Sequence, residues 1–172
     1  RLFKSAKKSI RLDFYIFYGD EANQMTDILV EKAKQGVEVK VIFDKNMGAM
    51  PMIKRPMEKI LKRFKNLNLK NLSAVKSANN ELKGKFRKSD HNKNIIIDEK
   101  IGMLGGMNVG DRFKNFHDIM VEFEGPAVKQ LQFWFDRDFC HAASKQPDKC
   151  DSLNGKSVED NDWDEELPGA TS

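Results

Sequence analysis

The stretch SIRLDFYIFYGDEANQMTDILVEKAKQGVEVKVIF, residues 9–43, predicts the architecture of the chain. Residues 9–18 are apolar on both faces of an extended segment, which is typical of a strand that helices cover on both sides. Asp20 can cap a helix, and apolar residues then recur at helical spacing up to Gly36. Residues 37–43 are rich in β-branched side chains and predict a second strand. This β-α-β order favours a parallel pair of strands with a right-handed crossover.

The rest of the chain continues the alternation of helices and strands. The pattern predicts a helix with Pro56 in its first turn, followed by a weak strand at 67–75 and a basic loop at 76–90. After the loop it predicts a hairpin of 94–98 with 101–104 and a strand at 116–123. The last predicted helix is opened by Gly125-Pro126 and buries Val128, Leu131, Trp134, Phe135 and Phe139. We therefore expect an α/β fold, an α/β/α sandwich with a mixed sheet.

Length and charge set the domain organisation. The 172 residues suit one domain, and no apolar run is long enough to span a bilayer. Residues 151–172 carry seven acids and one base, so we expect a domain at 1–147 and an acidic linker or tail at 148–172. The total charge of +4 then leaves +10 on residues 1–150, which indicates an anionic partner or a solvated basic surface. Since the chain begins with Arg1, we expect a fragment or a processed product.

Two cysteines, Cys140 and Cys150, are too few for a disulfide framework. We expect free thiols, although the pair is close enough in sequence to bridge in an oxidising compartment. No Cys and His spacing matches a zinc site, so we expect no bound metal.

A short motif after the basic loop can carry phosphate chemistry. His91 and Lys93 are two residues apart, so on a strand they would project from the same face. A lysine gives fixed positive charge to phosphate oxygens, and a neutral histidine can attack phosphorus or transfer a proton. Asn108, after a Gly-Gly turn, can donate an amide hydrogen bond to phosphate. His-x-Lys-x4-Asp alone arises by chance in a chain of this length with a probability on the order of 1%, and a lone histidine at a strand end is more often structural.

In combination these residues resemble the phospholipase D superfamily. His91, Lys93 and Asp98 are similar to its His-x-Lys-x4-Asp motif, and Asn108 is similar to its phosphate-binding asparagine. The resemblance covers nearly all of residues 1–143. The segments NVGDR, HD and EGPAV, which begin at Asn108, His117 and Glu124, are closer to cardiolipin synthases and related phosphatidyltransferases than to the short nucleases. Those synthases resemble two copies of this domain, and this chain is similar to the first copy.

The resemblance implies a metal-free, two-step phosphodiester transfer without a cofactor. One motif histidine attacks phosphorus and forms a phosphohistidine, and a second, across a pseudo-twofold interface, protonates the leaving alcohol. By position, His91 is one of this pair, and Lys93 and Asn108 bind the phosphate. Asp98 supports the motif, and Asp118 holds His91 in orientation.

The chain departs from the family pattern in three respects. Asn92 stands where the synthases often have Arg, and Glu99-Lys100 follow Asp98 where Gly is usual. Only one His-x-Lys-x4-Asp motif is present. His117 matches no residue of the family, and we expect it to be a surface or hydrogen-bonding residue.

Basic side chains gather in two further places. The helix face of Lys59, Lys62, Arg63 and Lys65 could bind an anionic bilayer or only confer solubility, and the loop bases Lys83, Lys85, Arg87 and Lys88 would shape the substrate entrance or contact the membrane.

Three hypotheses remain open. The first is a membrane-associated enzyme that acts on anionic phospholipids, with a second motif from another domain or subunit. The second is a nuclease that restores two motifs by homodimerising. The third is a fragment that binds phosphate or membrane without turnover. The last helix and the acidic tail favour the first, so nucleic acid is the less expected partner.

Overall fold

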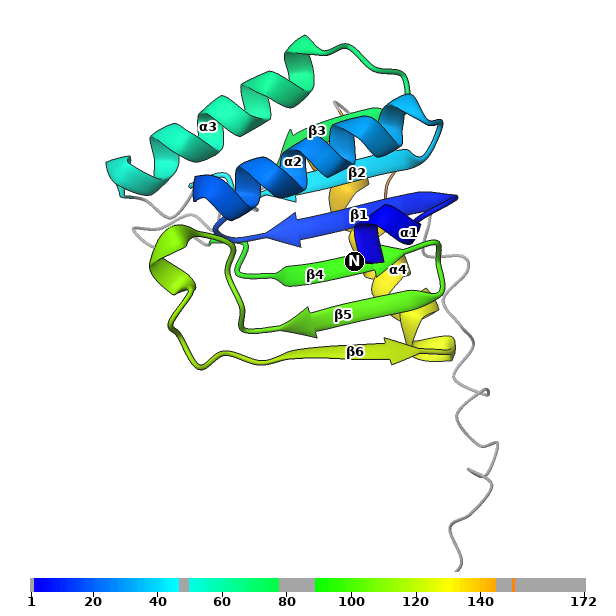
Figure 1. Ribbon diagram of the computed structural model, residues 1–172. Coiled ribbons are helices and arrows are strands. Elements are labelled where there is room, and N and C mark those ends of the chain that lie inside the picture. Colours follow the sequence, from blue (N-terminus) through cyan, green and yellow to red (C-terminus); the bar gives the residue numbers. More distant parts are fainter. Residues whose placement is uncertain (1, 47–49, 78–88, 145–149, 151–172) are drawn as a thin grey trace, which may run out of the picture.

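A mixed sheet forms the centre of the molecule (Figure 1). The computed structural model describes residues 2–46, 50–77, 89–144 and 150. The strands of these residues are β1 (Ser9–Phe14), β2 (Glu38–Phe43), β3 (Leu72–Lys76), β4 (Lys93–Ile97), β5 (Ile101–Gly105) and β6 (Met120–Glu124). The helices are α1 (Leu2–Ser5), α2 (Gly19–Lys34), α3 (Pro51–Asn66), the 3-10 turn η1 (Asp111–Phe113) and α4 (Pro126–Ala143).

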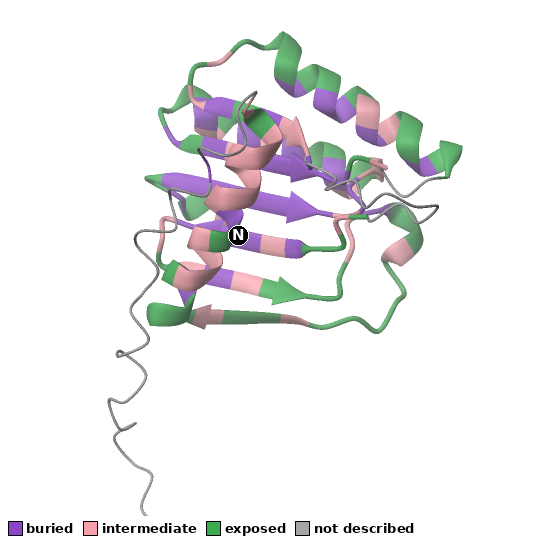
Figure 2. Ribbon diagram, turned by 180° about the vertical axis from the view of Figure 1, so that it is seen from behind, coloured by how far each residue is buried: buried purple, intermediate pink, exposed green. Residues whose placement is uncertain are grey.

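The strand order is β3-β2-β1-β4-β5-β6. β1, β2 and β3 are parallel, whereas β4, β5 and β6 each run antiparallel to their neighbours. Helices α2 and α3 cover one face of the sheet, and α4 crosses the other face (Figures 1 and 2). The expected α/β/α sandwich with a mixed sheet is therefore confirmed.

Burial explains why β1 lies at the centre. All six of its residues are buried, and its apolar side chains belong to the larger core under α2 and α3. A smaller core under α4 contains Ile42, Ile96, Val128 and Phe135. The expectation that β1 is apolar on both faces is wrong, because Arg11 and Asp13 are also buried in this strand. Arg11 Nε donates to Asp136 of α4 at 3.0 Å, so a partly buried ion pair joins this face of the sheet to α4.

Several element boundaries differ from the predicted ones. The first strand ends at Phe14, because the chain then bends and Phe17 forms an isolated parallel bridge with Val109. β6 begins at Met120, so residues 116–119 lie outside the strand. The face of α4 is less buried than expected: Trp134 is 44% exposed, and the guanidinium of Arg137 lies 4.2 Å from its ring centroid.

Two helix starts also differ. Pro51, not Pro56, opens α3, and Pro56 lies inside the helix although it removes a backbone donor there. Asp20 is not the cap of α2: the cap position is Tyr18, without a side-chain hydrogen bond. A carboxylate from elsewhere serves instead, since Asp111 Oδ1 accepts the backbone N–H of Asp20 at 3.2 Å. A side chain at Gly19 would clash with Asp111, because its Cβ would lie 2.5 Å from Oδ2.

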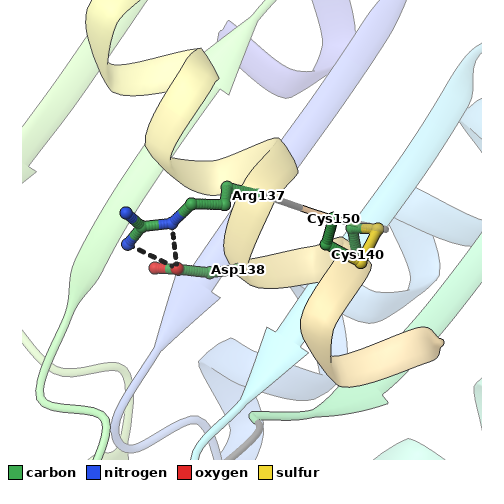
Figure 3. The surroundings of a disulfide bond; sticks show 4 residues. All are labelled: Arg137, Asp138, Cys140 and Cys150. Atoms are coloured by element: carbon green, nitrogen blue, oxygen red, sulfur yellow. Dashed lines mark hydrogen bonds and ion pairs between the residues drawn. A yellow bond between two sulfur atoms is a disulfide. The ribbon is translucent and has the colours of Figure 1, made fainter. Parts of the chain in front are cut away.

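Cys140 and Cys150 form a disulfide, so the expectation of free thiols is wrong (Figure 3). The bond links α4 to a buried Cys150 ten residues further along the chain. The basic loop bases Lys83, Lys85, Arg87 and Lys88, and the proposed boundary at residues 147 and 148, lie outside the described residues.

Candidate active site

The candidate site lies at the edge of the sheet where β1 ends and β4 begins. The antiparallel register pairs Phe14 with Lys93, so the segment before β4 reaches the carboxyl end of β1. In open α/β sheets this edge is the usual place for ligands. The topology therefore places His91 and Lys93 where a ligand can approach.

His91 and Lys93 are in direct contact, as their spacing predicts. Lys93 Nζ lies 3.1 Å from His91 Nδ1 and donates to the backbone oxygen of His91 at 2.7 Å. Lys93 is 3% exposed, whereas His91 is exposed. Burial lowers the pKa of Lys93, although the charges of Asp118, Asp13 and Asp90 act in the opposite direction. A buried ammonium thus lies directly behind an accessible imidazole.

The contact with Lys93 also decides the tautomer of His91. A protonated Lys93 can only donate, so Nδ1 of a neutral His91 is the acceptor and Nε2 carries the ring proton. This form can donate a hydrogen bond from Nε2, whereas transfer of a proton to a leaving oxygen requires the imidazolium, in which both ring nitrogens are protonated. Attack on phosphorus by Nε2 requires the other tautomer, in which Nδ1 donates to a carboxylate.

Tyr15 completes the base of the site. The ring centroid of Tyr15 lies 4.5 Å from that of His91. Lys93 Nζ lies 5.3 Å from the same centroid of Tyr15. The backbone N–H of Tyr15 donates to the carbonyl of Asn92 at 3.0 Å, which aligns the segments before β4 and after β1. Sequence reasoning treated Tyr15 only as an apolar strand residue. Its position directly after β1 is the signal that could have identified it.

Asn108 is brought to the same edge by the bridge between Phe17 and Val109. Val109 N donates to Ile16 O at 3.1 Å, and Tyr18 N donates to Val109 O at 3.0 Å. Oδ1 of Asn108 is buried and has no hydrogen-bond partner in the described part of the chain. This oxygen can accept a hydrogen bond but cannot donate one, so a contact with phosphate would have to come from Nδ2.

The Gly-Gly turn before Asn108 allows a close backbone approach. A Cβ at Gly105 would lie 2.0 Å from Ile119 O, and Gly106 N donates to that oxygen at 2.9 Å. A Cβ at Gly106 would lie 3.0 Å from Asp118 Oδ1. Asp118 is thus held beside the turn, but among the described residues no hydrogen bond joins it to His91. Its charge nevertheless acts on Lys93.

Asp98 lies at the opposite end of β4, about 17 Å of strand away from Lys93. Its Oδ1 accepts the backbone N–H groups of Lys7, Lys8 and Ser9 at 3.0, 2.7 and 3.0 Å. Burial raises the pKa of Asp98, but these three hydrogen bonds outweigh burial and hold the pKa below its ordinary value. Asp98 therefore fixes the entry into β1 and does not reach His91.

Sequence reasoning missed the buried Asp13 and the partly buried acids Asp90 and Asp138 near it. Asp13 is 1% exposed, and its Oδ2 accepts from Asn92 Nδ2 at 3.2 Å. Burial, followed by the charge of Asp90, raises the pKa of Asp13 to about 8, although the hydrogen bond from Asn92 acts in the opposite direction; the charge of Asp138 also contributes to the rise. Burial also raises the pKa of Asp90. Asp13 therefore holds a proton at neutral pH.

A cavity of about 470 Å³ is lined both by motif residues and by two of these acids, Asp13 and Asp138. Its lining includes His91, Lys93, Asp13, Asn94, Trp134 and Asp138. Among the described residues, no group of three or more His, Cys, Asp or Glu side chains is placed to hold a metal ion. A buried ammonium and an imidazole at a cavity of this size can bind and transfer a phosphoryl group.

Comparison with known proteins gives one family match and a set of relatives. Residues 1–139 match the family described as cardiolipin synthase, PLD-like domain. The major cardiolipin synthase ClsA of Bacillus subtilis (strain 168) is 32% identical over 146 residues, which cover 80% of this chain and 29% of that protein. The chain thus spans less than a third of the length of this relative.

Two solved structures have a similar fold. NucT from Helicobacter pylori superposes with a TM-score of 0.64 at 18% identity, covering 79% of this chain and 81% of that one. Nuc from Salmonella typhimurium, a phospholipase D family member, gives a TM-score of 0.57 at 19% identity and covers 80% and 82%. At these identities the likeness concerns the fold alone.

Proposed function

Because the chain belongs to the cardiolipin synthase group of the phospholipase D superfamily, we propose that it supplies one half of a catalytic centre for anionic phospholipids. The reaction is transfer or hydrolysis of a phosphodiester through a phosphohistidine. The observation that supports it most is the 3.1 Å contact between His91 Nδ1 and Lys93 Nζ at the 470 Å³ cavity.

The reaction needs two imidazoles in opposite protonation states. In the first step, Nε2 of one imidazole bonds to phosphorus while the bond from phosphorus to the leaving oxygen breaks. The second imidazole gives that oxygen its proton. In the second step, the acceptor alcohol or water loses a proton to the second imidazole, and its oxygen displaces the phosphoryl group from nitrogen. His91 is one of these two groups.

The other proposed residues divide between substrate and scaffold. Lys93 provides charge to the phosphate oxygens, and Asn108 provides an amide donor, so the site can stabilise the transition state without a metal. Asp118 would accept from Nδ1 of His91 in the nucleophilic tautomer, after that ring leaves its contact with Lys93. Asp98 supports the motif through the fold, because it binds the start of β1.

The second imidazole must come from elsewhere. His117 is exposed outside the strands, and one His-x-Lys-x4-Asp motif is present in the sequence. We propose that residues 1–147 form a half-domain, that 148–172 act as a linker, and that another phospholipase D-like domain or another subunit supplies the partner histidine. No described helix is long and apolar enough to cross a bilayer. The proposed location is at a membrane surface, where the substrate lies.

A substrate panel tests this function. The 172-residue chain, alone and within the longest natural protein that contains it, is incubated with phosphatidylglycerol vesicles and, separately, with DNA, with and without a chelator. We expect the longer protein to turn over phospholipid at a rate that the chelator leaves unchanged, with a bell-shaped pH profile, and we expect the 172-residue chain to be inactive or very weak unless it pairs. DNA cleavage without phospholipid turnover would contradict the lipid assignment. Full activity of a strictly monomeric 172-residue chain would contradict the need for a second motif.

A further inference from the structure

Helix α3 concentrates positive charge on its outer face. It carries one acid, Glu58, and six bases: Lys54, Arg55, Lys59, Lys62, Arg63 and Lys65. All six bases are exposed, whereas the opposite side of the helix is buried in the core. By contrast, α2 carries four acids and two bases, and α4 carries two of each. The excess is therefore a property of α3 and not of the helical layer as a whole.

Most of these bases have no acidic partner. Arg63 pairs with Asp27 of α2 at 2.6 Å, and Glu58 pairs with Lys76 at 3.6 Å. In the described part of the chain, no carboxylate lies within ion-pair distance of the other five bases of α3. Elsewhere several exposed lysines do have partners, such as Lys114 with Glu21 at 2.7 Å. Most of the positive charge of α3 therefore faces solvent without an acidic partner in the described part of the chain.

Apolar side chains accompany the charge at the beginning of α3. Met50 and Met52 are 42% and 67% exposed. Beside them, a hollow of about 480 Å³ between α2 and α3 combines Met52 and Ile60 with the base Lys59. Exposed methionines and a partly apolar hollow would not make a helix face more soluble. They add affinity for a surface that is anionic outside and apolar beneath.

This end of α3 lies at the same edge of the sheet as the candidate active site. α3 follows the carboxyl end of β2, which is parallel to β1, and β4 begins at that edge with Lys93 opposite Phe14. Figure 1 shows the start of α3 and the start of β4 on the same side of the molecule. A surface bound at the beginning of α3 would therefore be next to the opening at His91.

We propose that α3 is the membrane-docking helix of this protein and binds an anionic phospholipid surface. Its lysines and arginines lie against the headgroups, while Met50 and Met52 enter the apolar boundary. The proposal rests on the proposed function for the identity of the substrate and names the surface through which the protein reaches it. Nucleic acid fits less well, because phosphate contacts gain nothing from the exposed methionines.

Vesicle binding without turnover tests the proposal. The 172-residue chain is sedimented with vesicles of phosphatidylcholine containing phosphatidylglycerol, and with vesicles of phosphatidylcholine alone. The variant Lys54→Gln/Lys59→Gln/Lys62→Gln should bind the anionic vesicles about a hundredfold less tightly, because each base near an anionic surface is worth about fivefold. Met52→Ser should weaken binding about fivefold and should do so also at high salt.

A matched control keeps the net charge equal. The variant Lys34→Gln/Lys100→Gln/Lys129→Gln removes three exposed lysines from other elements and should lose less than fivefold. An equal loss in both triple variants would overturn the proposal, because binding would then follow net charge and not α3. Binding of a DNA duplex that depends on α3, without vesicle binding by the wild type, would overturn it as well.

Turnover of a monomeric, short-chain phosphatidylglycerol, measured within the longest natural protein that contains the chain, separates this inference from the proposed function. The α3 variants should turn over that soluble substrate within about twofold of the wild type, since no residue of α3 lines the cavity at His91. If the wild type bound vesicles through α3 but turned over no phospholipid, the proposed function would fail while the docking helix stood. If the α3 variants lost turnover of the soluble substrate, the docking role would fail.

Discussion

Replacing Asp13 by Asn is expected to stabilise the protein at neutral and higher pH. Asp13 is 1% exposed on β1, and its Oδ1 has no hydrogen-bond partner in the described part of the chain. Burial, followed by the charge of Asp90, raises its pKa from 3.8 to about 8, against a lowering hydrogen bond from Asn92. At neutral pH the folded protein therefore holds a proton on Asp13 that the unfolded chain releases.

The size of the effect follows from proton linkage. Between pH 3.8 and about pH 8 the folded state binds one proton more than the unfolded state, so this group makes the free energy of unfolding fall as the pH rises. The free energy of unfolding falls by about 1.4 kcal/mol per pH unit, so at pH 7 the protonation of Asp13 has lowered it by about 4 kcal/mol relative to pH 3.8. An Asn amide has the shape of a protonated carboxyl, can accept from Asn92 and does not ionise. Asp13→Asn should recover most of this free energy.

Chemical denaturation of the wild type and Asp13→Asn between about pH 4.5 and about pH 7.5 measures the effect. The difference in the free energy of unfolding should be small at the acidic end and should grow by about 1.4 kcal/mol per pH unit. Glu31→Gln, which removes an exposed carboxylate of α2, is the matched control and should show no such slope. Destabilisation by Asp13→Asn at pH 7.5, or a difference that does not change with pH, would refute the burial argument.

Three further predictions concern the framework around the site. Asp98→Asn should destabilise the protein by about 2 kcal/mol in urea denaturation, because three backbone donors lose a charged acceptor. Since the pKa of Asp98 is lowered in the folded protein, this contribution to stability is present above about pH 3.8 and is lost as the pH falls through the folded pKa. Cys140→Ser should lower the free energy of unfolding by about 3 kcal/mol, as expected for the loop closed over a separation of 10 residues, and thiol titration of the unfolded wild type should find no free thiol. Gly105→Ala should destabilise the protein by about 2 kcal/mol or more in thermal denaturation, because the alanine Cβ would lie 2.0 Å from Ile119 O. For each of these three variants, a stability within about 0.5 kcal/mol of the wild type would contradict the corresponding claim.

The sequence predicted those features that depend on periodicity and spacing. The β-α-β unit, the hairpin of β4 and β5 and the shared face of His91 and Lys93 follow from repeats of two or 3.6 residues, which local sequence shows directly. The two motif residues thus came together as expected.

The missed features depend on contacts between distant segments. The sequence predicted Asp20 as the cap of α2. In the folded chain the carboxylate of Asp111 serves at this helix start instead, because it accepts the backbone N–H of Asp20 across 91 positions of sequence. Pro56 was placed in the first turn, although Pro51 also precedes the apolar stripe and is the one that opens α3. The raised pKa of Asp13 could not be predicted, since Asn92, Asp90 and Asp138 come close to it only in the folded chain.

Substitution of two histidines tests the central claim most directly. His91→Ala and His117→Ala are compared with the wild type in the phosphatidylglycerol assay, within the longest natural protein that contains the chain, alongside thermal denaturation. We predict that His91→Ala loses turnover by about a thousandfold or more while its melting temperature is unchanged, and that His117→Ala stays within about twofold of the wild type. Turnover by His91→Ala within about tenfold of the wild type would contradict the assignment of His91 as one of the two reacting imidazoles.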